Sequence, residues 1–227
     1  MMRLLLFDID GTLVWGGPAK EAFHRAMVET YGTAGDIEVH SFAGKTDPQI
    51  ARELLRGAGL DDEAIEAGFP FLWKRYLEGL EDGLVVNPMT VLAGVPELIV
   101  SLSRMPGVGL GLLTGNIVGG ARLKLGSAGL FHYFEVGSFG SDAEDRDRLP
   151  AIALERARAW WGVDFAPRDV LIIGDTPRDV SCGLKEGLGT IGVATGHFGP
   201  EELRAAGAHH VMEDFSRTEQ VVELLAG

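Results

Sequence analysis

The stretch that decides the fold lies near the N-terminus, where residues 4–13 read LLLFDIDGTL. Its first half is apolar and uncharged, which is typical of a strand buried on both faces of a parallel sheet. The strand delivers two carboxylates, Asp8 and Asp10, and because they are two residues apart they leave it on the same side. Side-by-side acids repel each other, so we expect a cation or a shared proton to hold them. A simple turn built on Asp10-Gly11 is the alternative interpretation, and this stretch alone leaves both open.

The bulk composition is that of a packed globular protein. With 227 residues, of which 46% are hydrophobic and 23% charged, the chain suits one domain with a large insertion, or one large and one small domain. The formal net charge is −13 and no basic run occurs, so we expect neither nucleic acid nor an anionic membrane as a partner. The single cysteine, Cys182, excludes an intrachain disulfide. With no evident signal peptide or membrane-spanning stretch, we expect a cytoplasmic protein, either a monomer or a homodimer.

The first third of the chain reads as an insertion of helices. Residues 19–84 have a mostly helical pattern and no convincing strand. One helix ends at Gly32, and a second starts near Thr46 and continues through Leu80.

From Gly94 onward strands and helices alternate, which indicates parallel βαβ units with sites at the carboxyl ends of the strands. The strands are expected at 108–113, 133–136, 170–173, 190–193 and 209–212, and the helices at 95–105, 121–128, 148–161, 180–186, 201–206 and 218–226. We therefore predict an α/β fold with a core of residues 1–15 and 88–227 and a helical domain of residues 16–87.

Two further predicted strands end in polar side chains. Residues 112–116 read LLTGN, and a threonine hydroxyl with the amides of the following turn can hold a phosphoryl oxygen. A polar cap on a strand-to-helix turn would look the same. Residues 171–179 read LIIGDTPRD, in which Asp175 stands at a buried strand end and needs a partner. Asp179 follows Pro177 in a first helical turn, where the helix dipole by itself would explain a carboxylate.

Taken in order, these strand ends resemble the motifs of the haloacid dehalogenase (HAD) superfamily. Asp8-x-Asp10-Gly11-Thr12-Leu13 looks like its first motif, the strand ending in Thr114 like its second, and Gly174-Asp175-x-x-x-Asp179 like its fourth. The resemblance implies a Rossmann-like, three-layer parallel sheet core with an inserted α-helical cap. It also implies Mg2+-dependent phosphoryl transfer through an aspartyl-phosphate.

The resemblance assigns roles to particular residues. Asp8 would be the nucleophile, and Asp10 would protonate the leaving alcohol and later take a proton from water. Thr114, with the neighbouring Gly115 and Asn116, would bind the transferred phosphoryl group. Mg2+ would be held by Asp8, the Asp10 backbone carbonyl and Asp175, since hard cations prefer oxygen ligands. Asp179 and Thr12 would support these ligands.

The third motif is where the chain departs from the family. The family usually has a lysine before the helix that precedes the fourth motif, but residues 140–150 read GSDAEDRDRLP. Arg146 or Arg148 could supply the cation, and we favour Arg146 because it stands just before Asp147, the expected helix N-cap. An arginine keeps its charge and can bind phosphate through two hydrogen bonds. The alternative is that both arginines pair with the neighbouring acids on a solvated loop.

A polar stretch in the predicted insertion, residues 44–49, reads GKTDPQ. Thr46-x-x-Gln49 with an early proline is a helix capping box, which explains Thr46 without a functional role. Lys45 is not explained by capping. The stretch resembles the specificity loop of HAD phosphatases with a small helical cap, including phosphoglycolate phosphatases and β-phosphoglucomutases. That resemblance implies that Lys45 and Thr46 meet a second anionic group of the substrate.

The function expected from these motifs is Mg2+-dependent hydrolysis of a small organic phosphomonoester, with phosphoglycolate as the leading candidate. The expected partner is therefore a small phosphorylated metabolite. A dehalogenase is disfavoured because that chemistry does not require a second acid such as Asp10. Two alternatives stay open: a sugar phosphomutase of the β-phosphoglucomutase type, and a non-catalytic binding protein in which the missing lysine marks lost activity.

Overall fold

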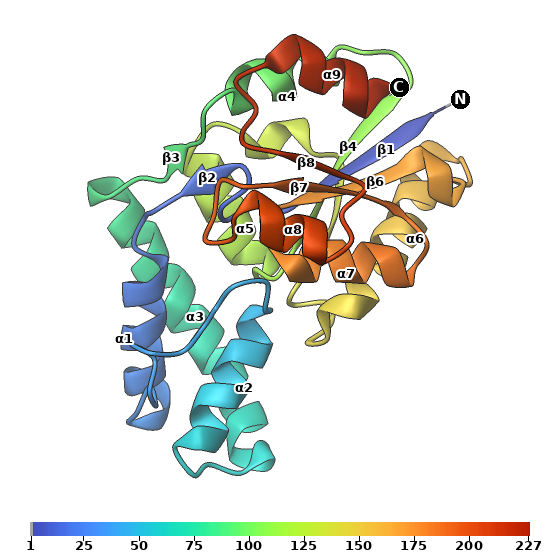
Figure 1. Cartoon of the computed structure of the whole chain (residues 1–227). Helices are drawn as coiled ribbons and strands as arrows, with labels where there is room; N and C mark the ends of the chain where they lie inside the picture. Colours follow the sequence, from blue (N-terminus) through green and yellow to red (C-terminus); the bar gives the residue numbers. More distant parts are fainter. Residues whose placement is uncertain (1) are drawn as a thin grey trace.

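The computed structural model describes residues 2–227 and is built on a six-stranded parallel sheet (Figure 1). The strand order is β5-β4-β1-β6-β7-β8. The strands are β1 (Arg3–Phe7), β4 (Val108–Thr114), β5 (Val136–Phe139), β6 (Val170–Gly174), β7 (Gly189–Val193) and β8 (His210–Met212). With helices on both faces, this is the predicted Rossmann-like α/β fold.

Alternation along β1 separates two hydrophobic cores. Leu5 and Phe7 belong to the larger core, to which α4 (Val95–Ser103) and α9 (Thr218–Ala226) also contribute. Leu4 and Leu6 belong to the smaller core on the opposite face, with residues of α6 (Leu149–Trp161) and α7 (Pro177–Lys185). Since these four side chains of β1 are fully buried, the central strand is apolar on both faces, as a covered parallel sheet requires.

The register of the sheet brings the polar strand ends together. Phe7 pairs with Leu112 on β4 and with Ile173 on β6, so the residues that follow these strands emerge at one edge. The chain runs from β1 outward to β5 and then crosses to β6 on the other side of β1. Such a reversal of strand order opens a crevice at the carboxyl ends of the strands, where α/β proteins bind ligands.

Three helices follow the first turn of the chain and lie against one end of the sheet (Figure 1). They are α1 (Ala19–Tyr31), α2 (Asp47–Gly57) and α3 (Asp62–Val86), and together with their connections we call them the helical segment. Phe23 of α1 and Tyr76 of α3 are buried, with ring centroids 5.3 Å apart in an edge-on arrangement. Thr46 caps α2 by accepting a hydrogen bond from the Gln49 amide, as the capping pattern predicts.

The helical segment joins the sheet through a short antiparallel pair, β2 (Val14–Trp15) and β3 (Thr90–Val91). The chain leaves the core after β2 and returns to it at β3. We therefore keep, as a proposal, the division into a core of residues 1–15 and 88–227 and a helical domain of residues 16–87.

Some predicted elements are wrong in position. Residues 131–133 form a short 3-10 turn, and the strand expected at 133–136 instead runs from Val136 to Phe139. Because Gly137 and Ser138 are not apolar, this edge strand lacks the apolar run by which a buried strand is predicted. The single helix expected from Thr46 through Leu80 is two helices, because the chain leaves the helix after Gly57 and Asp61 caps a new one. Within residues 2–227, no helix combines the length and the apolar character that a membrane span requires.

α5 (Val118–Ser127) follows β4, and α8 (Pro200–Ala205) packs on β7 and β8 near the edge of the sheet. α5 also contacts α3, so it lies between the sheet and the helical segment. This position becomes important for the site, because α5 presents a buried lysine to the end of β1.

Candidate active site

A compact turn follows β1 and carries the two aspartates. The Ile9 carbonyl accepts hydrogen bonds from the amides of Leu13 (2.9 Å) and Val14 (3.1 Å), which folds residues 9–14 tightly. Gly11 adopts a left-handed backbone conformation, with φ 82°. A Cβ at this position would lie 2.3 Å from an Asp175 carboxylate oxygen, so only glycine lets the turn approach the end of β6.

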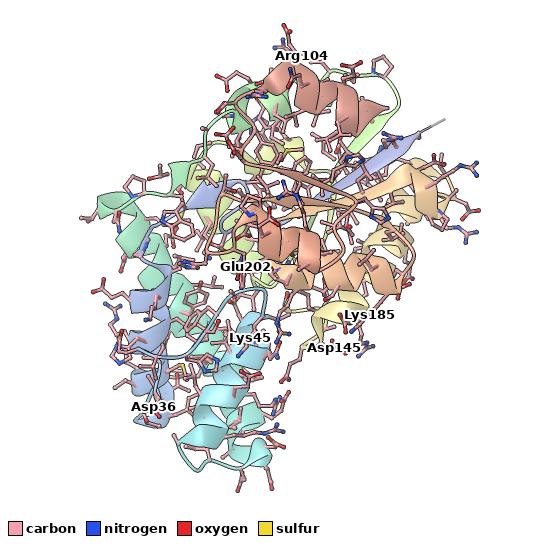
Figure 2. All side chains as sticks on the ribbon, viewed as in Figure 1. Asp36, Lys45, Arg104, Asp145, Lys185 and Glu202 are labelled. Atoms are coloured by element: carbon pink, nitrogen blue, oxygen red, sulfur yellow. The ribbon has the colours of Figure 1, made fainter. Side chains whose placement is uncertain are left out.

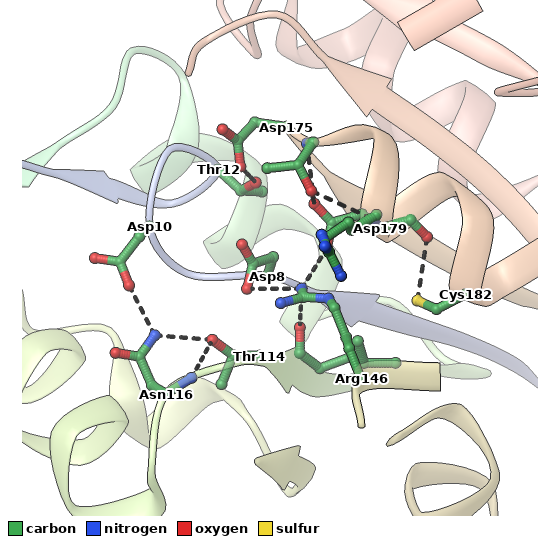
Figure 3. Close-up of polar contacts among 12 residues, drawn as sticks. Asp8, Asp10, Thr12, Thr114, Asn116, Arg146, Asp175, Asp179 and Cys182 are labelled. Carbon is green, nitrogen blue, oxygen red and sulfur yellow. Dashed lines mark hydrogen bonds and ion pairs between the residues drawn. The ribbon is translucent and has the colours of Figure 1, made fainter. Parts of the chain in front are cut away.

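Three carboxylates meet at the ends of β1 and β6 (Figure 3). Asp8, Asp175 and Asp179 are buried, and each offers an oxygen within 4.8 Å of the others. The Thr12 hydroxyl donates to Asp175 Oδ1 at 3.3 Å. Asp179 is fixed by the helix start: its Oδ2 accepts from the Thr176 amide (3.0 Å) and hydroxyl (2.7 Å) in a capping box. Asp179, predicted as a supporting residue, is thus a member of the cluster itself.

One guanidinium faces these three acids. Arg146, 4% exposed, lies 3.2 Å from Asp8 Oδ1 and forms a closer ion pair with Asp179. Its Nε has no hydrogen-bond partner among residues 2–227, which leaves a buried donor for a ligand. Of the two arginines considered for the missing lysine, the structure brings Arg146 to the site. Arg148 is exposed and does not line the cavity described below.

The loop that carries Arg146 is capped differently from the prediction. Asp145, and not Asp147, accepts a hydrogen bond from a following amide, that of Asp147, at 3.0 Å. Asp147 instead forms an ion pair with Lys185. A short 3-10 turn, Arg146–Arg148, precedes α6, so the cap lies earlier in the chain than a directly starting helix would put it.

Negative charge is in excess at the cluster. Burial raises the pKa of Asp8 above its usual range, although the nearby Arg146 guanidinium lowers it. Burial also raises the pKa of Asp175, and the charges of Asp179 and Asp8 add to this effect. Three buried carboxylates opposed by one guanidinium would be stabilised by a divalent cation. The all-oxygen donor set fits a hard cation such as Mg2+.

The Asp10 carboxylate points away from this cluster. Its Oδ2 accepts from the Asn116 side-chain amide at 2.7 Å, and both of its oxygens lie 2.8 Å from Lys124 Nζ. Asp10 was predicted to meet the metal through its backbone carbonyl, and that role stays a prediction. Asn116 Nδ2 also donates to the Thr114 hydroxyl, at 2.9 Å. The threonine, the amide and the second acid therefore form one hydrogen-bonded chain.

Lys124 is the residue that the sequence analysis missed. It lies on α5, and its side chain is 6% exposed. The signal was present in the spacing: Ala121, Lys124 and Leu125 fall on one helix face, and the two apolar members are buried. A lysine on the buried face of a helix requires a charged partner. That partner is Asp10.

A cavity of about 460 Å³ opens between this edge of the sheet and the helical segment. From the core it is lined by Asp8, Asp10, Thr114, Asn116, Lys124, Arg146 and Asp175. From the helical segment it is lined by Lys20, Phe23, His40, Phe42, Lys45, Asp47, Ile50 and Tyr76. A volume of this size is typical of small-molecule sites, so the acidic cluster faces a space that a small ligand can fill.

The start of α2 is bound tightly to the core. The Asp47 amide donates to the Gly115 carbonyl (2.8 Å), and the Ile117 amide donates to Asp47 Oδ2 (2.8 Å). A Cβ at Gly115 would lie 2.0 Å from the Lys45 carbonyl oxygen, so Gly115 permits a close approach of two backbones. The Thr46 hydroxyl donates to the Glu144 carbonyl (2.7 Å), and Thr46 lies outside the cavity lining. Its hydroxyl is committed to this contact and to the cap.

Lys45 lies where the helical segment meets the core (Figure 2). Its ammonium donates to Glu53 Oε2 at 2.5 Å and lies 3.2 Å from His40 Nε2. Lys45 thus lines the cavity, as expected for a substrate contact, but its charge is already matched by a glutamate.

The fold is that of a known class of enzymes. The family model described as haloacid dehalogenase-like hydrolase matches residues 2–187, and the chain belongs to this family. The predicted family and the assignment as a hydrolase are confirmed.

Relatives within the family are similar over their whole length. A phosphoglycolate phosphatase of Rhodobacter capsulatus is 26% identical over 229 residues, covering 98% of both chains. A phosphoglycolate phosphatase of Synechococcus elongatus is 27% identical and covers 99% of both chains. Among solved structures, a hydrolase from Pseudomonas syringae superposes with a TM-score of 0.74 over the full length of both chains at 20% identity. A putative β-phosphoglucomutase from Thermotoga maritima gives a TM-score of 0.64 at 20% identity, covering 99% of this chain and 100% of that one.

Proposed function

We propose that the protein is a Mg2+-dependent phosphatase that hydrolyses a small organic phosphomonoester, with Asp8 as the nucleophile. The observation that carries this proposal is the buried cluster of Asp8, Asp175 and Asp179, opposed by one arginine and facing the cavity. Asp8, Asp175 and the backbone carbonyl of Asp10 would hold the cation. When bound, it would withdraw charge from the phosphoryl oxygens and make phosphorus more electrophilic.

The residues support a two-step transfer. In the first step, an Asp8 oxygen attacks phosphorus, the bond from phosphorus to the alcohol oxygen breaks, and Asp10 gives that oxygen a proton. In the second step, water attacks the phosphorus of the acyl-phosphate, Asp10 takes a proton from this water, and Asp8 is released together with inorganic phosphate. Asp10 lies beside the cavity, and its two donors fix the direction of its carboxylate.

Arg146 and Thr114 would bind the transferred phosphoryl group. Arg146 carries a permanent positive charge next to Asp8 and has a free Nε donor, which supports its role in place of the family lysine. Preorganised donors of this kind lower the energy of a transition state in which negative charge moves onto the phosphoryl oxygens. Because Arg146 is already fixed by Asp8 and Asp179, little reorganisation accompanies binding.

Phosphoglycolate is the substrate named for the curated relatives, and it serves as the reference substrate of the test. The experiment measures phosphate release from a panel of phosphomonoesters, in Mg2+ and in chelator. We expect release only in Mg2+, and its loss in the Asp175→Asn variant. Release that is equal in chelator would overturn the metal dependence, and a folded protein that releases phosphate from no ester would overturn the proposed function.

A further inference from the structure

The part of the cavity that lies beyond the phosphoryl site is formed by the helical segment. If the phosphoryl group sits at Asp8, the alcohol part of the ester must extend toward the opposite wall, which α1, α2, α3 and the loop before α2 provide. We call this wall the alcohol side of the cavity. Its apolar and aromatic members include Phe23, Phe42, Ile50 and Tyr76, and its polar members are Lys20, His40, Ser41, Lys45 and Asp47. Its chemistry decides which alcohol fits.

The lysine on the alcohol side is neutralised within the protein. Lys45 Nζ lies 2.5 Å from Glu53 Oε2, and Glu53 Oε1 in turn accepts from the Gln49 side-chain amide at 2.9 Å. Partial burial alone would raise the pKa of Glu53, but the hydrogen bonds from Lys45 and Gln49 hold the pKa below its usual range, so the glutamate is ionised near neutral pH. A substrate carboxylate arriving at Lys45 would meet this second negative charge.

Two other basic side chains of the helical segment line the cavity, His40 and Lys20. Partial burial and the adjacent Lys45 lower the pKa of His40, which favours a neutral imidazole near neutral pH. Lys20, at 48% side-chain exposure, pairs with Glu38 at 3.1 Å in solvent. Lys124 is held by Asp10 on the opposite wall. Among the lysines that line the cavity within residues 2–227, each has a carboxylate partner.

Beside these polar groups, the alcohol side has an apolar and aromatic surface. Phe23 is 2% exposed, and its ring centroid lies 6.1 Å from that of Phe42 and 5.3 Å from that of Tyr76. Ile50 adds an aliphatic surface from α2. An apolar alcohol would gain free energy by leaving water for this wall, whereas a carboxylate would lose its hydration without an unpaired lysine to compensate.

We propose that the preferred substrate is a phosphomonoester whose alcohol is uncharged and carries an apolar alkyl or aryl group, in preference to a carboxylate-bearing ester such as phosphoglycolate. This inference rests on the proposed phosphatase function. It makes Glu53 a specificity-determining residue, because it pairs with the Lys45 ammonium, which could otherwise attract an acid.

The first test compares matched alkyl phosphates, so that the reactivity of the leaving group stays similar. We expect kcat/KM to rise from 3-phosphooxypropionate to propyl phosphate and again to 2-phenylethyl phosphate, with at least about a tenfold difference between the first two. A carboxylate ester that equals or exceeds propyl phosphate would overturn the inference and leave the phosphatase intact. No release from any of the three, with release from other esters of the panel, would overturn this inference alone, whereas no release from any ester would overturn the phosphatase and this inference with it.

The second test frees the lysine. Glu53→Gln removes one charge while keeping a side chain that Gln49 can contact, and it leaves Lys45 without its carboxylate. We expect the ratio of kcat/KM for phosphoglycolate to that for propyl phosphate to rise about tenfold or more, and to fall back in the double variant Glu53→Gln/Lys45→Met. The matched control is Glu78→Gln, an exposed glutamate of α3 that pairs with Arg75 outside the cavity. An unchanged ratio in Glu53→Gln would overturn the role of Glu53, and an equal rise in Glu78→Gln would show a non-specific charge effect and overturn it too.

Discussion

Lys124 and Asn116 hold the Asp10 carboxylate from two sides, and this fixes the direction in which its oxygens point. Lys124→Met keeps the length of the side chain and removes its charge, so Asp10 loses one of these two constraints. We expect kcat/KM for propyl phosphate to fall about 10- to 100-fold, within the range that general acid-base catalysis contributes. For p-nitrophenyl phosphate, whose leaving group needs no proton, we expect a much smaller loss.

The control for Lys124→Met is Lys185→Met, which removes an exposed lysine paired with Asp147. It is expected to leave kcat/KM for both esters unchanged. Equal losses on the two esters in Lys124→Met would indicate a structural role only and would contradict the positioning of Asp10.

Asp47 predicts a pH dependence of stability. Burial raises the pKa of Asp47 to about 6 from an ordinary value of 3.8, although Lys124 and the Ile117 amide act in the opposite direction. The folded state therefore binds this proton more tightly than the unfolded state. The protonated Asp47 contributes its whole stabilisation to the free energy of unfolding at low pH, and this contribution is lost as the pH rises from about 4 to about 6. Asp47→Asn cannot titrate. In urea unfolding, the free energy of unfolding of the variant minus that of the parent should increase as the pH rises from about 4 to about 6, and should stay constant above pH 6. A difference that is constant from pH 4 to 6 would contradict the prediction.

Single residues at strand ends were predictable, and residues brought together by packing were not. Asp8, Thr114 and Asp175 each stand at the end of an apolar run, and the resemblance to the haloacid dehalogenase motifs grouped them into one site. Lys124 comes from a helix and meets Asp10 only because α5 packs beside the turn after β1. The pairing of Lys45 with Glu53 likewise depends on how the loop before α2 folds back on that helix, which no local pattern encodes.

At the scale of elements, the turn after β1 requires a glycine at the position of Gly11. Gly11 and Gly16 both have positive φ, 82° and 79°, so an alanine is strained at either position. A Cβ at Gly11 would also collide with the Asp175 carboxylate, whereas a Cβ at Gly16 has no heavy atom within 4 Å among the described residues. We expect Gly11→Ala to lose about 1–3 kcal/mol more free energy of unfolding than Gly16→Ala, measured by urea denaturation. Equal losses would show that backbone strain alone matters at this turn.

The elements themselves followed from the sequence to different degrees. Helix α2 begins where Thr46 and Pro48 predict, and α9 spans Thr218–Ala226 as expected, because caps and periodicity act locally. The pair β2 and β3 was missed, since strands of two residues have no periodicity to read. β5 was displaced because Gly137 and Ser138 are held in the sheet by their pairing with β4 and not by their own propensity.

At the scale of the whole molecule, the acidic cluster should couple metal binding to folding. Asp8, Asp175 and Asp179 are buried with too little positive charge, so a cation that binds only the folded state stabilises it. At about 100 times its dissociation constant, Mg2+ would contribute about 2.7 kcal/mol, which corresponds to about 5–10 °C in Tm for a chain of this size. Asp175→Asn should lack this shift and melt above the parent protein in chelator, because one buried charge is gone. An equal Mg2+ shift in the variant would contradict the assignment of the cation site.

The overall architecture was predictable because its parts follow general rules: parallel βαβ units, an insertion after the first strand, and a site at the carboxyl ends of the strands. The position of the helical segment over that site was not. It depends on contacts such as those of Asp47 with Gly115 and Ile117, which join residues far apart in the chain. The shape and charge of the cavity follow from this placement, and so does the inference about the alcohol.

The most direct test of the central claim is the rate of phosphate release by Asp8→Asn in Mg2+, compared with the parent protein on the same ester. Asparagine has nearly the same shape as aspartate but cannot form the acyl-phosphate, and circular dichroism would verify that the variant is folded. We predict that kcat/KM falls to the uncatalysed background. A folded Asp8→Asn protein that keeps its activity within about tenfold of the parent would contradict Asp8 as the nucleophile, and with it the proposed mechanism.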